Sequence, residues 1–118
     1  RLNQAMDLGS AYSSVLMQND IIVARANLKN ITNKSAVVGY RVAENSLSQG
    51  LASYCLSELI AIAKKRFFLE YLTAQVLENN PASMRVLQKH NFQTTSVTAN
   101  FLTLNGKTLS CTEFQLSL

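Results

Sequence analysis

The sequence predicts an α+β protein built on one mixed β-sheet, and three features lead to that prediction. Apolar and polar residues alternate along IIVARANLKNI (21–31), which is the period-2 pattern of a half-buried strand. From Gly50 to Arg66 the hydrophobic period changes to 3.6, as in an amphipathic helix. Near the end of the chain, Asn105-Gly106 separates two strand-like runs, and this dipeptide favours a type I′ hairpin turn.

The N-terminal half is expected to contain a short helix followed by three strands. Leu2, Ala5 and Met6 have helical spacing, and Gly9-Ser10 would end a helix there. The last of the three strands is an unbroken apolar run, which suits a central strand covered on both faces. The strands are AYSSVLMQ (11–18), IIVARANLKNI (21–31) and AVVGYRV (36–42).

The C-terminal half is expected to alternate helix and strand before it ends in a hairpin. FLEYLTAQV (68–76) follows the 50–66 helix and predicts a strand. Asn80 is a good N-cap and Pro81 suits the first helical position, so a second helix should run to about residue 90. Asn91 stands where a left-handed residue commonly ends a helix. The closing strands are FQTTSVTANFLTL (92–104) and KTLSCTEFQLSL (107–118).

Length and composition limit the class of protein. The 118 residues are enough for one domain with a hydrophobic core and too few for two. No apolar run approaches the roughly 18 residues of a membrane span, and no signal peptide is visible. Because the first residue is Arg1, we expect the sequence to begin inside a longer native chain. Cys55 and Cys111 form no zinc-ligand pattern with the single histidine, so a reduced, cytoplasmic setting with both thiols in the core is predicted.

The chain is basic, with a formal net charge of +4 and a pI of about 9.3. Such a charge suits a nucleic acid, a phosphorylated ligand or solubility alone. The run Lys64-Lys65-Arg66 falls at the predicted end of a helix, where cations stabilise the helix dipole. Aromatic residues do not interleave with the basic ones, so a nucleic-acid surface is the weakest of the three interpretations.

Two stretches could carry chemistry. In NSLSQGLASY (45–54), Gly50 and Ala52 leave little side-chain bulk at a strand-to-helix junction, where successive backbone N–H groups can hold a phosphate. An ordinary tight turn has the same composition. In NNPASMRVLQKHNF (79–92), Asn80 and Ser83 can serve only as helix-start residues, or they can face a ligand at the helix N-terminus.

Three other titratable residues receive plainer interpretations. His90 falls in the last turn of the second helix, where stabilising the helix end is favoured over catalysis. Glu44 and Glu78 each follow a strand end, and solvated loop carboxylates are favoured over helpers in proton transfer.

Together, the two stretches resemble the GNAT (Gcn5-related) N-acetyltransferases, most of all the RimJ/RimL-type ribosomal-protein N-terminal acetyltransferases. The resemblance covers residues 20–118, from IIVARANLKNI through both stretches to the hairpin FLTLNGK. It implies an α/β sandwich with a mixed, mostly antiparallel central sheet flanked by helices. It also implies a single domain over 1–118 that lacks the family's N-terminal strand and helix.

The family's junction is Q/R-x-x-G-x-G/A, whose backbone amides hold the pyrophosphate of acetyl-CoA. Gly50 and Ala52 fit this pattern, whereas Leu47 stands at the Q/R position. By the same resemblance, the backbone of Arg41 and Val42 pairs with the pantetheine arm. The junction residues expected to bind acetyl-CoA are Ser48, Gln49, Gly50, Leu51, Ala52 and Ser53.

Asn80 and Ser83 match the family's N-x-x-S motif. The resemblance implies that Asn80 contacts the cofactor arm and that Ser83, as the catalytic residue, protonates the departing CoA thiolate. No metal is expected. Some members carry an acidic residue early in the penultimate strand as a base, and Asn100 stands about there.

Amine ionisation indicates the acceptor. An α-amine with a pKa near 7.8 is roughly one-third neutral at pH 7.5, whereas a lysine near 10.4 is about 0.1% neutral. That difference of about 3.5 kcal/mol means that a site without an obvious base suits a protein N-terminus. We therefore expect acetyl transfer from acetyl-CoA to a primary amine, preferably the α-amine of a protein such as a ribosomal protein, by a bacterial monomer or homodimer without nucleic-acid or membrane partners.

Two alternatives stay open. A small amine such as a polyamine or an antibiotic could be the acceptor. Alternatively, the protein could hold acyl-CoA without turnover, which Leu47 and Asn100 favour.

Overall fold

The computed structural model describes residues 2–8, 11–43 and 50–118 of the chain. These residues form seven strands and two helices. In chain order they are β1 (Leu2–Leu8), β2 (Ala11–Gln18), β3 (Ile21–Lys29), β4 (Ser35–Val42), α1 (Leu51–Lys65), β5 (Tyr71–Leu77), α2 (Pro81–Lys89), β6 (Gln93–Leu104) and β7 (Lys107–Ser117).

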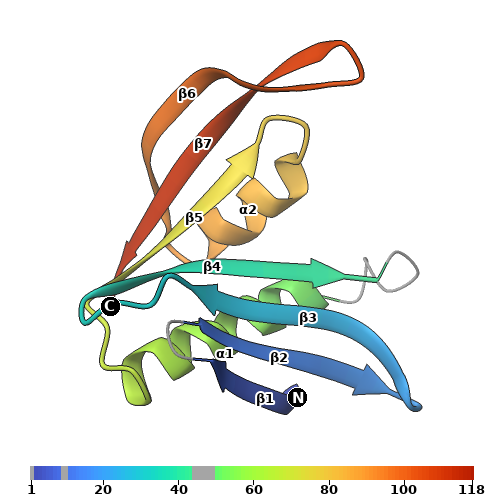
Figure 1. Ribbon diagram of the computed structural model, residues 1–118, viewed down its shortest axis with the longest axis vertical. Helices are drawn as coiled ribbons and strands as arrows, with labels where there is room; N and C mark the ends of the chain where they lie inside the picture. Colours follow the sequence, from blue (N-terminus) through green and yellow to red (C-terminus); the bar gives the residue numbers. More distant parts are fainter. Residues whose placement is uncertain (1, 9–10, 44–49) are drawn as a thin grey trace.

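The strands form one sheet in the order β1-β2-β3-β4-β5-β7-β6 (Figure 1). Neighbouring strands are antiparallel except for β4 and β5, which are parallel and are connected through α1. The prediction of a mixed, mostly antiparallel sheet flanked by helices is therefore confirmed.

The parallel seam is short. β4 and β5 pair only through Ser35–Val37 and Tyr71–Thr73. Beyond these residues the two strands diverge, while β4 continues along β3 as far as Val42 and β5 continues along β7 as far as Leu77 (Figure 1). The sheet is thus split in its middle toward the carboxyl ends of β4 and β5.

Both helices contribute to one core. α1 packs against β3 and β4 and also contacts α2. The buried side chains of α1 recur at helical spacing, as the 3.6-residue period predicts, and every second side chain of β5 (Leu72, Ala74 and Val76) is buried as well. The largest fully buried side chains that make up this core are Leu28, Cys55, Leu56, Leu59, Leu72, Leu87 and Phe114.

The opposite face of β4 is less covered than the sequence predicts. Ala36 and Val38 are buried toward the helices, whereas Val37 and Gly39 are only half-buried and Arg41 is exposed. β4 does lie in the centre of the sheet, as predicted. The expectation that both of its faces are covered is wrong for the described residues, because successive side chains of a strand point to opposite faces and both helices lie on one.

The first element is a strand, so the predicted helix over residues 1–8 is wrong. β1 pairs with β2 in antiparallel register, from Leu8 opposite Ala11 to Leu2 opposite Leu16. An isolated helix of eight residues is marginal because its first turn is costly to nucleate. Pairing with β2 satisfies the backbone groups of both strands at once.

The local signals for turns and helix ends are confirmed. Asn91 adopts a left-handed φ of 70° after α2, and the φ values of Asn105 and Gly106 are 50° and 75°, as a type I′ turn requires. Cys55 and Cys111 are free and buried, as predicted. No helix in the described part of the chain is both long and apolar enough to cross a membrane.

At the basic end of α1, one of the three cations packs against aromatic rings and is not only solvated. Lys64 and Lys65 lie in its last turn, as expected. The Arg66 guanidinium, however, stacks over the rings of Tyr12 and Phe67, at 5.6 and 5.7 Å from their centroids. These cation–π contacts fasten the helix end to β2.

Candidate functional site

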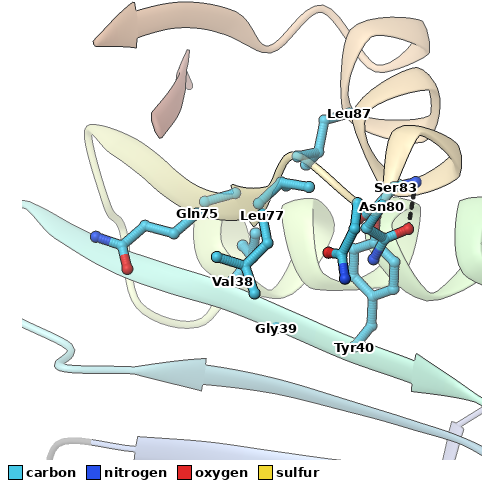
Figure 2. A pocket seen from close by; sticks show the side chains of 11 residues that line it. Val38, Gly39, Tyr40, Gln75, Leu77, Asn80, Ser83 and Leu87 are labelled. Carbon is cyan, nitrogen blue, oxygen red and sulfur yellow. Dashed lines mark hydrogen bonds between the residues drawn. The ribbon is translucent and has the colours of Figure 1, made fainter. Parts of the chain in front are cut away.

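A cavity of about 280 Å³ lies where β4 and β5 diverge (Figure 2). β4 and β5 form its walls, and the first turns of α2 close one side. The lining residues are Val38, Gly39, Tyr40, Ala74, Gln75, Val76, Leu77, Asn79, Asn80, Ser83 and Leu87.

A second hollow, of about 470 Å³, extends from this cavity toward the start of α1. Tyr40, Asn80 and Ser83 line both hollows, so the two meet at the start of α2. We call the second hollow the groove. Its lining residues are Tyr40, Arg41, Val42, Ala52, Asn80, Ala82, Ser83 and Val86.

The start of α1 is bare. Gly50 caps the helix in a left-handed conformation, with φ 70° and ψ 15°, and no side chain hydrogen-bonds to the cap. A Cβ atom built on Gly50 would meet no atom of the described residues within 4 Å. The first-turn N–H groups of a helix carry a partial positive charge. The junction therefore offers backbone donors beside open space, which suits an anion.

Ser83 has two polar partners at the other end of the groove. Its backbone N–H donates to Asn80 Oδ1 at 3.2 Å, which confirms Asn80 as the N-cap of α2. Its Oγ lies 3.0 Å from the Tyr40 hydroxyl. Burial raises the pKa of Tyr40, although the hydrogen bond to Ser83 opposes that rise. The phenol therefore stays protonated at neutral pH and can donate to Ser83 Oγ.

Sequence reasoning missed Tyr40. Alternation along β4 places Tyr40 on the same face as the buried Val38, so a core role was the natural interpretation. The signal that could have found it is the polar hydroxyl at the end of an otherwise apolar strand, next to the predicted cofactor residues. Only the fold brings α2 against that end of β4.

The predicted cofactor residues separate into three groups. Arg41, Val42, Ala52, Asn80 and Ser83 come together around the groove. Gly50, Leu51 and Ser53 lie at the cap and in the first turn of α1, where the Leu51 side chain is part of the core. Leu47, Ser48 and Gln49, like Glu44, lie outside the described residues.

The Ser53 side chain is engaged by α2. Its Oγ lies 2.7 Å from Nε2 of His90, the C-cap residue of α2. Burial, with a smaller effect of Lys89, lowers the pKa of His90 below its usual 6.5. A neutral imidazole is therefore favoured, and His90 ties the two helices together instead of placing a cation at the helix end.

This link predicts a pH dependence of stability. The lowered pKa of folded His90 means that its contribution is fully present above the unfolded value of about 6.5 and is lost as the pH falls through the folded value. We expect the wild type to lose more unfolding free energy between pH 7.5 and 5.0 than His90→Gln does. Urea denaturation at both pH values measures this, and equal losses would contradict the assignment.

The two remaining candidates for a role in proton transfer, Glu78 and the position of Asn100, lie outside the cavity. The Glu78 carboxylate accepts the Ser110 backbone N–H at 2.7 Å, so it anchors the end of β5 to β7. Asn100 is exposed on β6 with a φ of 53°. Among the described residues that line the cavity there is no carboxylate, histidine, lysine or arginine.

Three comparisons bear on the identity of this chain. The family model described as "Acetyltransferase (GNAT) domain" matches residues 2–93. In a comparison with curated proteins, no significant match was found. Many solved structures share the fold.

Three of these structures are acetyltransferases. A spermidine N-acetyltransferase SpeG mutant from Vibrio cholerae is 13% identical, with a TM-score of 0.85, and the match covers 92% of this chain and 66% of that one. The acetyl-CoA complex of yncA, a putative acetyltransferase from Salmonella typhimurium, is 22% identical, with a TM-score of 0.85 and coverage of 92% and 65%. RimL, a ribosomal L7/L12 alpha-N-protein acetyltransferase in complex with coenzyme A, is 20% identical, with a TM-score of 0.84 and coverage of 93% and 63%.

This chain therefore spans about two-thirds of the length of these structures. Their TM-scores of 0.84 and 0.85 show that the fold is shared, and the family model, which matches residues 2–93, shows the family. The diverging parallel strands, the bare start of α1 and the groove between them agree with both findings. The chain belongs to the GNAT acetyltransferase family.

Proposed function

We propose that this protein is an acetyl-CoA-dependent N-acetyltransferase of the RimJ/RimL type, whose acceptor is the α-amine of a protein N-terminus. One observation carries the proposal: a continuous path leads from the bare start of α1, along the groove, to Ser83 in the cavity between the diverging strands. A long anionic molecule with a reactive end fits such a path.

The residues present fit acetyl-CoA. The first-turn amides of α1 and the open space at Gly50 can receive the pyrophosphate. Beyond Val37, β4 no longer pairs with β5, so its backbone at Arg41 and Val42 is available to the amide groups of a pantetheine arm. The name of the yncA structure records acetyl-CoA in a protein of the same fold.

When bound, acetyl-CoA supplies an activated thioester. With acetyl-CoA bound, the C–S bond would break as the amine forms the new C–N bond. Ser83 Oγ–H would protonate the departing sulfur, and Ser83 Oγ would regain a proton from the attacking amine, directly or through water, as the place of Ser83 in the cavity and the N-x-x-S motif support. Either hydroxyl can donate in the Tyr40–Ser83 pair; with the protonated Tyr40 as donor to Ser83 Oγ, the Ser83 proton is free to point into the cavity. Leu87 and Val38 give the cavity apolar walls that limit water around the transfer.

None of the described residues that line the cavity is a base, which favours an α-amine as the acceptor. A neutral nucleophile must reach the cavity, and an α-amine supplies it near neutral pH far more often than a lysine does. The free, buried Cys55 and Cys111 support a reducing, cytoplasmic setting. We further propose that residues 1–118 form a single GNAT domain.

We expect peptides with a free α-amine to be acetylated faster than N-blocked peptides that carry a lysine. The ionisation difference sets a ceiling of roughly two orders of magnitude on this preference at pH 7.5. Release of the CoA thiol over matched peptides measures it. Faster turnover of the blocked lysine peptides, or of spermidine, would redirect the assignment to a lysine or polyamine enzyme.

The second candidate is an acyl-CoA-binding protein without turnover, which is favoured because no described residue of the cavity lining is a carboxylate. Thermal stabilisation by acetyl-CoA with no thiol release over the whole amine panel would support it.

A further inference from the structure

Two arginines lie side by side on the face of the sheet opposite α1. Arg25 of β3 and Arg41 of β4 are direct cross-strand partners, and both side chains are exposed. The residues that flank Arg25, Ala24 and Ala26, are buried in the core under α1. Alternation therefore directs both guanidinium groups away from α1.

Like charges directly opposite each other destabilise a pair of strands. The described neighbours do not compensate this pair. Across β2 the partner of Arg25 is Val15, and the next residues along the same face are Asn27 and Gly39. A hollow of about 290 Å³ lies at the pair, and the other described residues that line it are uncharged: Ile22, Val23, Ala24, Val42 and Ala43. An anionic group of a ligand would relieve the repulsion between the two guanidinium groups.

A second observation points to a ligand on the same face. Asn27 and Gly39 are also cross-strand partners, one pair further along. The Asn27 Oδ1 atom is buried and has no hydrogen-bond partner among the described residues. A Cβ on Gly39 would lie only 2.6 Å from that oxygen, so the Asn27 amide covers Gly39. A buried carbonyl oxygen without a donor costs stability, which a ligand N–H would recover.

The arginine pair and Asn27 lie next to the cavity between β4 and β5. Gly39 lines the cavity, and Arg41 lies two residues further along the same strand face, about 7 Å away. A molecule whose amine enters the cavity beside Gly39 and Asn27 therefore has its next few atoms within reach of Arg41 and Arg25. The guanidinium fork binds carboxylates well because it offers paired N–H donors.

We propose that Arg25, Arg41 and Asn27 form the acceptor site and select peptides with acidic residues directly after the reactive N-terminus. This proposal rests on the proposed function and names its substrate class. The arginine pair binds carboxylates at the second and third positions. The Asn27 amide accepts an N–H of the α-amine after it turns and brings its buried Oδ1 to the surface. Polycations such as spermidine are repelled by the same pair.

The test measures peptide binding separately from acetylation. Three peptides with a free N-terminal serine, identical except for two glutamates, two glutamines or two lysines at the second and third positions, carry a C-terminal fluorophore. Fluorescence anisotropy in the presence of CoA gives Kd for each peptide. We expect the wild type to bind the glutamate peptide on the order of tenfold more tightly than the glutamine peptide, and the lysine peptide most weakly.

Matched variants locate the effect. Arg25→Gln should reduce the glutamate preference, and the double variant Arg25→Gln/Arg41→Gln should abolish it. Lys29→Gln is the control, because Lys29 loses the same charge on the same strand and face, roughly 13 Å from Arg25. Arg25→Glu should shift the preference toward the lysine peptide, which a loss of folding could not do.

Different results would contradict the arginine site and the acetyltransferase activity. Equal binding of the three peptides by the wild type, or a preference that survives in the double variant, overturns the arginine site whether or not any peptide is acetylated. Charge-selective binding with no thiol release from any of the three peptides supports the arginine site and contradicts the transferase.

Discussion

Ser83→Ala should lower kcat by 10²- to 10⁴-fold, the usual range for loss of a general acid, while the Kd for acetyl-CoA changes little. The Ser83 hydroxyl stabilises charge that develops only as the sulfur departs, so its loss weakens the transition state and not the ground state. The helix should survive the change, because the bond to Asn80 uses the backbone N–H that alanine retains.

Turnover and cofactor affinity are measured on the same preparation. Tyr40→Phe is the companion variant, since it removes the 3.0 Å partner of Ser83 and leaves the Ser83 hydroxyl in place. If Tyr40 acts through Ser83, the double variant should be no slower than Ser83→Ala alone. Unchanged turnover in Ser83→Ala would reduce Ser83 to a helix residue, and an equal loss of affinity and turnover would make its role binding.

Gly50→Asp should abolish the stabilisation that acetyl-CoA gives the fold. In the wild type that stabilisation is about 2.7 kcal/mol at a hundredfold excess over Kd. The substitution places a carboxylate in the open space at the start of α1, where it competes with the pyrophosphate for the same N–H donors and repels it. Melting curves with and without acetyl-CoA measure the effect.

The chain contains a matched control for this experiment. Gly106 has a φ of 75°, close to the 70° of Gly50, and a Cβ there also meets no atom within 4 Å. Both aspartates therefore suffer the same left-handed strain, of about 1–2 kcal/mol. Gly106→Asp should melt earlier yet keep its full response to acetyl-CoA. An unchanged response in Gly50→Asp would show that the junction is only a turn.

Local signals in the sequence predicted most of the fold. Pro81 after Asn80 marked the start of α2, and Asn105-Gly106 marked the final hairpin, because each of these turns depends on residues adjacent in sequence. The helix predicted over residues 1–8 is wrong for the opposite reason. Their conformation is decided by pairing with β2, which outweighs a helical spacing spread over only two turns.

The site was predictable only where backbone motifs determine it. Gly50, Asn80 and Ser83 could be assigned because a small residue at a junction and a cap at a helix start are visible in the sequence. Tyr40 could not, since its partner Ser83 is 43 residues away. Nor could the Arg25–Arg41 pair, because a shift of one residue in the β3–β4 register would send one of the two to the other face.

The short seam between β4 and β5 also determines how the molecule can open. The four strands β1–β4 and the three strands β5, β7 and β6 are joined by only three residue pairs, between β4 and β5. Separating these two parts of the sheet therefore breaks fewer backbone hydrogen bonds than opening any other pair of neighbouring strands. The halves are held chiefly by the contact of α1 with α2 and by the core that both helices cover. In amide exchange the free domain should therefore behave as two cooperative units joined at the seam. A ligand bound between β4 and β5 would join the two units into one. Binding of the ligand would therefore also make unfolding of the whole sheet cooperative.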